Sequence, residues 1–195
     1  MTDNSMPEDR AELWPVSEVE DVWSGPAPFS VRRDIVSAPG HPDEAFGRLV
    51  IEHPGAAVIL AVDDDGRALV VSQYRHPAAM RLVELPAGLL DVPGEDPLVA
   101  AKRELMEEGA HTADHWEHLL TLLPTPGLSS EKHVFYLATG LRHVPDRGGF
   151  TLEHEEAHME THWVPIDDLL RGVLDGSFAD GPLAVAVMAY RLRRT

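Results

Sequence analysis

One predicted helix, from about Asp96 to Glu108, limits the fold of this chain more than any other segment. It carries Glu104, Glu107 and Glu108, and because residues three and four apart are neighbours on a helix, their carboxylates lie on one side. An apolar stripe about a quarter turn away consists of Leu98, Ala101 and Leu105. A helix of this kind packs its stripe against a sheet and holds its acidic side at the rim.

The acidic side of this helix predicts a metal site. Like charges at this spacing destabilise a helix by roughly 0.2–0.5 kcal/mol per pair unless a cation lies between them. Hard divalent ions take oxygen ligands of this type, completed by waters and substrate phosphates. We therefore expect Mg²⁺, for which Mn²⁺ can substitute, with Glu104 and Glu108 as ligands and Glu107 beside them.

The segment from Gly88 to Glu108 resembles the signature of Nudix hydrolases, Gly-x5-Glu-x7-Arg-Glu-U-x-Glu-Glu-x-Gly-U, where U is a bulky apolar residue. The matching residues are, in order, Gly88, Glu95, Arg103, Glu104, Leu105, Glu107 and Glu108. The resemblance implies an α/β protein with the Nudix fold, an α/β/α sandwich with a mixed sheet. It also implies that the backbone carbonyl of Ala87 is a further metal ligand and that Arg103 braces Glu95.

The chain departs from this signature at two places. Six residues instead of five separate Gly88 from Glu95, which lengthens a loop before the helix. Ala110 and His111 occupy the final Gly-U pair, and a glycine stands one position early, at Gly109. Because glycine adopts a left-handed backbone at no steric cost, we expect a helix end shifted to Gly109, with the acidic side unchanged.

Three further stretches are similar to one branch of the family, the ADP-ribose pyrophosphatases. They are Gln73-Tyr74-Arg75, Glu84-Leu85-Pro86-Ala87-Gly88 and Pro126-Gly127-Leu128-Ser129-Ser130-Glu131. This resemblance implies hydrolysis of ADP-ribose to AMP and ribose 5-phosphate, with Glu131 near the substrate. Arg75 and Arg81 precede the motif and suit bidentate phosphate contacts, although each could form a surface salt bridge instead. Glu84 could touch substrate or only pair with Arg81.

Hydrolysis also needs a general base to deprotonate the attacking water. In related pyrophosphatases the base comes from a mobile loop, and the matching stretch here is 151–160. Alignment on the following apolar strand favours Glu155, with Glu156 and Glu153 as neighbours that could serve instead; Glu108 completes the catalytic candidates. A solvated acidic loop is the plain alternative. His154, His158 and His162 have a helical zinc spacing, but their loop context argues against a zinc site.

Two other functions remain open. The first is a pyrophosphatase that acts on another nucleoside diphosphate sugar, because base and sugar selectivity come from loops. The second is a Nudix-like ligand sensor without catalysis, which the intact acidic residues and the absence of a basic helix-turn-helix segment make the weaker alternative.

The alternation of apolar and polar residues predicts three regions. Residues 1–16 form an acidic, disordered tail, residues 17–54 a small antiparallel sheet, and residues 55–195 the Nudix domain. In the resembling family this small sheet builds a homodimer, and a short isolated sheet is marginal alone. Gly55–Val62 and Ala68–Gln73 are expected to pair as a hairpin across an Asp-Asp-Asp-Gly turn.

Composition limits partners and location. The net charge of −17 argues against binding to nucleic acid, whose phosphates need basic patches. No apolar run approaches the ~18 residues that span a bilayer, and the N-terminus lacks the pattern of a signal peptide. The chain has no cysteine, which excludes disulfides and fits a reducing compartment. We expect a cytoplasmic enzyme that binds no membrane.

Overall fold

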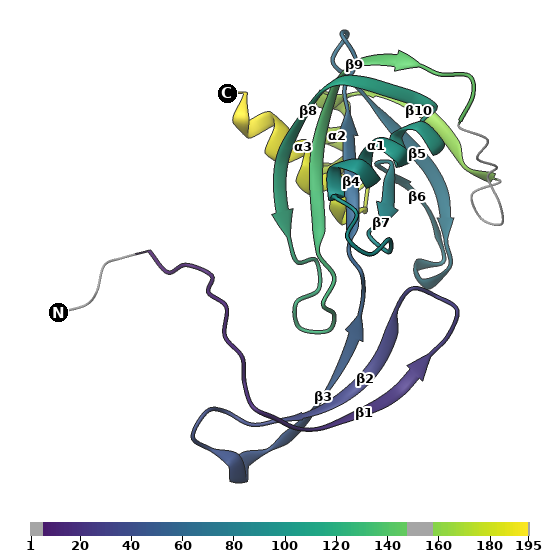
Figure 1. The fold of residues 1–195 in the computed structure, drawn as a ribbon. Coiled ribbons are helices and arrows are strands. Elements are labelled where there is room, and N and C mark those ends of the chain that lie inside the picture. The colour runs from purple at the N-terminus through teal and green to yellow at the C-terminus, as the bar shows by residue number, and fades with distance from the viewer. Residues whose placement is uncertain (1–5, 148–157, 195) are drawn as a thin grey trace. The chain divides into compact units, whose positions relative to one another are not determined.

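The computed structural model describes residues 6–147 and 158–194 (Figure 1). The chain divides into two compact units between Glu52 and His53. Residues 6–15 contain no helix or strand, and residues 1–5 of the expected tail lie outside the described part. Within the described residues, no helix is long and apolar enough to cross a membrane.

The first unit is a sheet of three antiparallel strands in the order β1-β2-β3. The strands are β1 (Val16–Ser24), β2 (Ser30–Val36) and β3 (Phe46–Glu52), with a short 3₁₀ turn, η1 (Pro42–Glu44), before β3. Among the described residues of this unit only Asp34 and Ser37 are buried, and both are polar. The sheet therefore has no apolar core of its own.

The described residues of the second unit form two sheets and three helices. An antiparallel sheet has the strand order β10-β5-β6, and a mixed sheet has the order β7-β4-β9-β8, in which β4 and β9 are parallel. The strands are β4 (Ala56–Ala61), β5 (Arg67–Arg75), β6 (Met80–Glu84), β7 (Ala87–Leu89), β8 (His111–Leu122), β9 (His133–His143) and β10 (Glu160–Pro165). The helices are α1 (Pro97–Glu107), α2 (Ile166–Asp175) and α3 (Gly181–Arg193), with a 3₁₀ turn, η2 (His76–Ala78), after β5.

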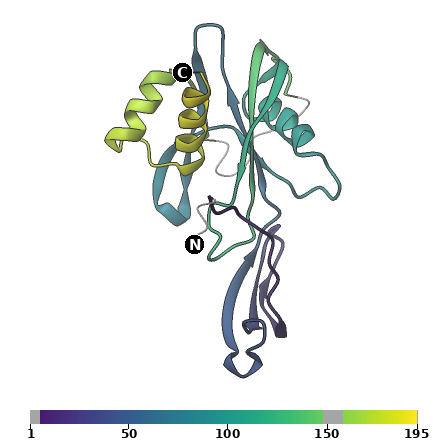
Figure 2. The ribbon, with the colours of Figure 1, turned by 90° about the vertical axis from the view of Figure 1, so that its left-hand side faces the viewer.

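Strand β4 shows why this unit is layered. Successive side chains of a strand point to opposite faces, and every residue of β4 is buried. Ala57 and Ile59 pack in the cluster that includes α1, whereas Val58 and Leu60 pack in the cluster that includes α2 and α3. Figure 2 shows α1 on one side of the strands and α2 and α3 on the other. The result is a three-layer α/β/α arrangement.

The expected hairpin between the strands now named β4 and β5 is wrong. Strand β4 pairs with β7 and β9, and β5 pairs with β6 and β10. The two share only an isolated bridge, Val62–Ala68. Both strands are buried along most of their length, so each needs covering elements on both faces, and adjacency in sequence does not decide which partner it takes.

Two boundaries also differ from the sequence pattern. Strand β7 was not expected, because its three residues follow a proline and include a glycine. It exists because Ala56, Ala57 and Val58 of β4 pair with it. The apolar pattern of the sequence predicts a strand around Trp116–Leu123. Strand β8 begins five residues earlier, at His111, and pairs with β9 along that added length.

The end of helix α1 also contradicts the expectation. Ala110, and not Gly109, adopts the left-handed conformation, with φ of 54°. Gly109 serves a different purpose, because a Cβ there would lie 2.7 Å from the carbonyl oxygen of Leu105 and 2.8 Å from Leu69 Cδ2. Steric crowding therefore favours glycine at position 109, and Ala110 adopts the strained left-handed conformation of the turn.

These two positions should respond to substitution in opposite directions. Ala110→Gly removes the left-handed strain and is expected to raise the free energy of unfolding by roughly 1 kcal/mol. Gly109→Ala introduces the close contacts and is expected to lower it by more than that. Chemical denaturation with equal m-values measures both effects. Destabilisation by Ala110→Gly would contradict this account of the helix end.

Candidate active site

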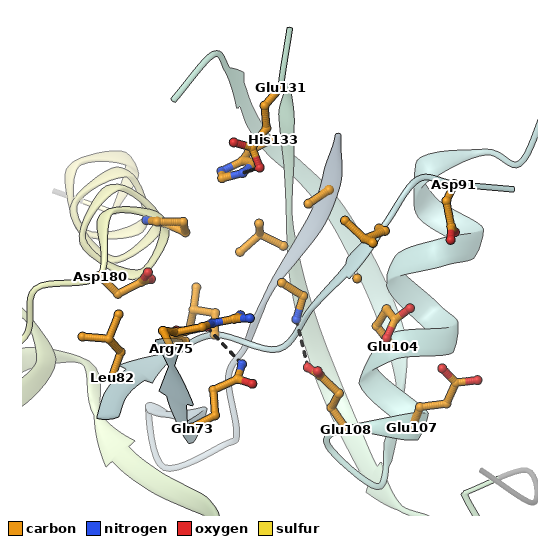
Figure 3. A pocket seen from close by; sticks show the side chains of 18 of the residues that line it. Gln73, Arg75, Leu82, Asp91, Glu104, Glu107, Glu108, Glu131, His133 and Asp180 are labelled. Atoms are coloured by element: carbon orange, nitrogen blue, oxygen red, sulfur yellow. Dashed lines mark hydrogen bonds and ion pairs between the residues drawn. The ribbon is translucent and has the colours of Figure 1, made fainter. Parts of the chain in front are cut away.

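A cavity of about 640 Å³ opens in the second unit, between α1, strands β5 to β7, the start of β9 and the start of α3. Figure 3 shows its labelled side chains in two groups. Glu104, Glu107 and Glu108 lie on the α1 side, and Arg75 and Asp180 lie on the other. The predicted acidic side of the helix therefore faces a cavity and not open solvent.

Local sequence explains how α1 reaches this place. Asp96 accepts a hydrogen bond from Leu98 N at 2.8 Å, and Pro97 fills the first helical position, where its missing N–H costs nothing. Ala101 and Leu105 are fully buried against the sheet. Glu104 and Glu108 are also buried, with 9% and 6% of their surface exposed. Burial of the stripe thus carries two carboxylates into the interior.

Strand β7 meets the acidic side of α1 at two points. Ala87 N donates a hydrogen bond to Glu108 Oε2 at 3.1 Å. A Cβ on Gly88 would lie 2.0 Å from Glu104 Cδ, so a side chain there would move this carboxylate from its position. The first motif glycine is thus explained by the space that Glu104 needs.

Arg103 sits among three carboxylates. Its Nη1 donates to Glu104 Oε1 at 2.5 Å and to Glu107 Oε2 at 3.1 Å, and its Nη2 lies 3.6 Å from the buried Glu95 Oε2. Burial lowers the pKa of Arg103, but the three carboxylates raise it more, so the net pKa is above the ordinary value. The expected contact with Glu95 is therefore one of three.

The donors around the cavity suit a hard cation. Within the described residues, no three His, Asp or Glu side chains already converge on one metal position. Arg103 accounts for this in part, because its guanidinium donates hydrogen bonds to the carboxylates of Glu104 and Glu107. Mg²⁺ usually needs only one or two carboxylates and completes its shell with waters and phosphates. The all-oxygen set on this side of the cavity fits such an ion.

Arg75 lies on the side of the cavity opposite α1, where two hydrogen bonds to Glu84 fix the orientation of its guanidinium. Its Nε and Nη2 donate to the two oxygens of Glu84 at 2.9 and 2.7 Å, and the buried amide of Gln73 donates to Glu84 at 3.1 Å. The hydrogen bonds that Arg75 donates to Glu84 raise the pKa of Arg75, and the charges of Glu108 and Asp180 raise it further, against the effect of burial. Arg75 thus remains cationic between two acidic groups.

Arg81 is not brought into the cavity. It donates through Nη1 to the backbone carbonyls of Ser72 and His158, both at 3.1 Å. Leu82 and Glu84 line the cavity and alternate with Arg81 along β6, so Arg81 projects from the other face. The alternative pairing of Glu84 with Arg81 is also wrong, because Glu84 pairs with Arg75.

Glu131 lines the cavity together with two histidines. Its Oε1 lies 2.9 Å from His133 Nε2 and 3.6 Å from His53 Nδ1. His133 is buried, and its Nδ1 has no hydrogen-bond partner among the described residues. This arrangement places the predicted Glu131 at the end of the cavity away from α1.

Asp180 completes the site and was not expected from the sequence. It is the N-cap of α3, and its Oδ2 accepts from Leu183 N at 2.8 Å. Burial raises the pKa of its carboxyl from 3.8 to about 6; the Leu183 hydrogen bond opposes this, Glu84 adds to it, and Arg75 and His133 oppose it. In sequence, Asp180 before Gly-Pro indicates only a helix start.

Three of the predicted site residues lie outside the part of the chain that the structure describes. The expected base Glu155 and its neighbours Glu156 and Glu153 fall within 148–157, outside the described residues. Gln73 and His133 were also missed as site residues. Gln73 lies within the matched Gln-Tyr-Arg stretch, and His133 lies two residues after the matched Glu131. Their position in or beside these stretches was the signal that could have identified them.

Comparison with known proteins identifies relatives of this chain. Residues 52–182 match the model of the NUDIX domain family. The chain is 46% identical over 161 residues to an ADP-ribose pyrophosphatase of Mycobacterium tuberculosis, covering 83% of this chain and 75% of that one. It is 32% identical over 150 residues to an ADP-ribose pyrophosphatase of Bacillus subtilis, covering 77% and 79%. A crystal structure of an ADP compounds hydrolase superposes with a TM-score of 0.70 at 20% identity, covering 94% and 95%, which shows a shared fold.

The raised pKa of Asp180 predicts how stability depends on pH. Between pH 3.8 and about 6 the folded chain binds a proton at Asp180 that the unfolded chain releases, so stability falls as pH rises through this range. The full penalty, on the order of 2 to 3 kcal/mol, applies above about pH 6. Asp180→Asn keeps an oxygen for the helix cap and removes the charge.

We therefore expect Asp180→Asn to unfold at higher denaturant concentration than wild type near pH ~8, with the difference vanishing near pH ~4. Denaturation curves at both pH values measure this. An equal difference at both would show that the carboxyl does not titrate as described.

Proposed function

The chain belongs to the Nudix family of hydrolases, and we propose that it cleaves the pyrophosphate bond of ADP-ribose with Mg²⁺ as its cation. Water adds across the P–O–P bond, so the products are AMP and ribose 5-phosphate. The expected family, fold class and enzyme class are confirmed by the family match and by the related ADP-ribose pyrophosphatases. The choice of Mg²⁺, the site residues and the quaternary state are proposals.

One observation carries the proposed activity: a single cavity joins the carboxylates of α1 to the guanidinium of Arg75. A pyrophosphate resists attack because its oxygens are already negative, so its cleavage needs positive charge on more than one side. Arg75 supplies one charge, and the α1 carboxylates supply the ligands for another. The observation favours a diphosphate substrate over a neutral one.

The proposed cation ligands are Glu104, Glu107, Glu108 and the carbonyl of Ala87. A bound divalent ion supplies charge neutralisation and lowers the pKa of a bound water. The chain itself positions the ligands, because Gly88 leaves room for Glu104 and Ala87 N orients Glu108. Arg103 holds Glu104 and Glu107 and gives part of the acidic side a positive partner.

Arg75 is the proposed phosphate ligand. Its two bonds to Glu84 use Nε and Nη2, which leaves Nη1 for a phosphate oxygen. The side-chain amide of Gln73 donates a hydrogen bond to Glu84. The orientation of the Arg75 guanidinium is therefore fixed before the substrate binds. Glu84 then acts on the substrate through Arg75, and Glu131 is proposed to act at the opposite end of the same cavity.

The proposed general base is Glu155, with Glu156 and Glu153 as the alternatives that the sequence leaves open. General-base catalysis contributes about 10²–10⁴-fold, so the correct glutamine variant should lower kcat by that order with little change in KM. Single glutamine variants at the three positions, compared in one assay, identify the residue.

Turnover provides the central test. Purified protein with Mg²⁺ should release AMP and ribose 5-phosphate from ADP-ribose, and excess chelator should abolish this. Glu108→Gln keeps an oxygen that can accept from Ala87 N, so the fold should survive while kcat/KM falls by at least roughly 100-fold.

A matched control is Glu117→Gln on β8, whose side chain is 61% exposed and lies outside the cavity lining. It should retain wild-type turnover. A panel of other nucleoside diphosphate sugars and nucleoside triphosphates completes the assay. Faster release of pyrophosphate from a triphosphate than of AMP from ADP-ribose would overturn the substrate assignment.

We also propose a homodimer built through the sheet β1-β2-β3, in a cytoplasmic protein, a location that a chain without cysteine fits. The sheet lacks an apolar core, and large hydrophobic side chains on it are exposed. These are Val16, Val19, Val22, Trp23, Phe46 and Leu49. A three-stranded sheet is marginal unless a hydrophobic face is covered, and a second copy of the sheet offers a complementary apolar surface.

Light scattering at micromolar concentration should give twice the chain mass of 21.4 kDa. Leu49→Glu places a charge on the proposed interface, where Leu49 is 55% exposed, and should yield the monomer mass. The same change at Leu123, which is 54% exposed and outside this sheet, should leave the dimer intact. A wild-type monomer would refute the assembly.

A further inference from the structure

The cavity has a second polar side that the proposed chemistry does not use. Asp180 at the start of α3 and His133 at the start of β9 both line it, and Arg75 lies between Asp180 and the carboxylates of α1 (Figure 3). The charges of Asp180 and Glu108 both raise the pKa of Arg75, because both carboxylates lie near its guanidinium. A diphosphate held at Arg75 would extend toward this second side.

The side chain of Asp180 has one oxygen more than the capping of α3 requires. Capping of α3 uses one oxygen, Oδ2, which accepts from Leu183 N. Serine or asparagine caps a helix about as well and without the cost of burying a charge. The raised pKa of the Asp180 carboxyl reflects the free-energy cost of burying its charge. Its second oxygen is therefore a hydrogen-bond acceptor that the fold retains at a loss of stability, as is common at functional sites.

His133 adds an independent observation. Its Nε2 lies 2.9 Å from Glu131 Oε1, and because an ionised carboxylate only accepts, Nε2 carries the proton. The other ring nitrogen, Nδ1, is buried without a partner among the described residues. A buried polar atom of this kind is rarely left unpaired in folded proteins. It calls for a hydrogen-bonding group from a bound molecule.

The chemistry of this side selects its ligand. Asp180 and Glu131 present acceptors only, so they attract hydroxyl groups and repel a phosphate, and a hydroxyl group can also pair with His133 Nδ1. The described residues that line the cavity include no Phe, Tyr or Trp, the side chains that offer a purine base the largest stacking surface. A sugar that carries free hydroxyls meets both conditions.

We propose that Asp180 and His133 form a sugar subsite that binds the hydroxyl groups of the non-nucleoside sugar of the substrate and disfavours a phosphate in that position. This inference rests on the proposed function, in which that sugar is the terminal ribose of ADP-ribose. Asp180 determines specificity here, because it touches the part of the substrate that distinguishes a diphosphate sugar from a nucleoside triphosphate.

Asp180→Asn is the direct test, because it keeps one oxygen for Leu183 N and turns the other acceptor into a donor. We expect KM for ADP-ribose to rise about tenfold or more, the effect of a lost hydrogen bond to a charged group, while kcat changes less than about threefold. Product inhibition should weaken by a similar factor for ribose 5-phosphate and stay unchanged for AMP. Asp180→Ser, which keeps only the cap oxygen, should behave alike.

Asp96→Asn is the matched control, since Asp96 caps α1 in the same way and does not line the cavity. Its kinetic constants should equal those of wild type. His133→Phe, which keeps a planar ring and removes both nitrogens, should weaken ribose 5-phosphate more than AMP.

The outcomes separate this inference from the proposed function. If wild type hydrolyses ADP-ribose but Asp180→Asn keeps its KM, or weakens AMP as much as ribose 5-phosphate, the sugar subsite is wrong and the function stands. If wild type prefers another nucleoside diphosphate sugar and Asp180→Asn raises KM for that compound, the subsite stands and the substrate is reassigned.

Discussion

The structure of the site depends on the close packing of helix α1 against strands β4 and β7. Ala101 and Leu105 can be fully buried only if the helix lies tightly on the sheet, and this brings Glu104 against the backbone of Gly88. Burial of apolar surface thus holds carboxylates in a place that they would not occupy by themselves. The same contact gives Glu108 the backbone N–H of Ala87 as a partner.

Charge inside the cavity is balanced around two arginines. Arg103 lies among the carboxylates of Glu95, Glu104 and Glu107, and Arg75 lies between Glu84, Glu108 and Asp180. A buried carboxylate is costly unless it is paired, and each guanidinium serves several. A diphosphate adds negative charge to this balance, which explains why the proposed activity requires a divalent cation as well as Arg75.

Much of the fold could be predicted from the sequence because its strands and helices carry clear periodicities. The apolar runs Gly55–Val62 and Ala68–Gln73 predicted β4 and β5, and the helix expected from about Asp96 to Glu108 is observed as α1. The errors have a common origin. Strand β7 and the first five residues of β8 are strands only because β4 and β9 pair with them, and the hairpin of β4 with β5 failed because both prefer other partners.

The sequence by itself determined the acidic helix, the Nudix family and the candidates Arg75, Glu84 and Glu131, because these depend on spacing within short segments. Only the tertiary structure decided that Glu84 pairs with Arg75, that Arg81 projects away, and that Asp180 and His133 share a cavity with α1. It also placed the left-handed turn at Ala110, since Gly109 is crowded by Leu69 of strand β5 as well as by the carbonyl of Leu105. Contacts between distant segments leave no periodic trace in a sequence, so they appear only when packing brings the segments together.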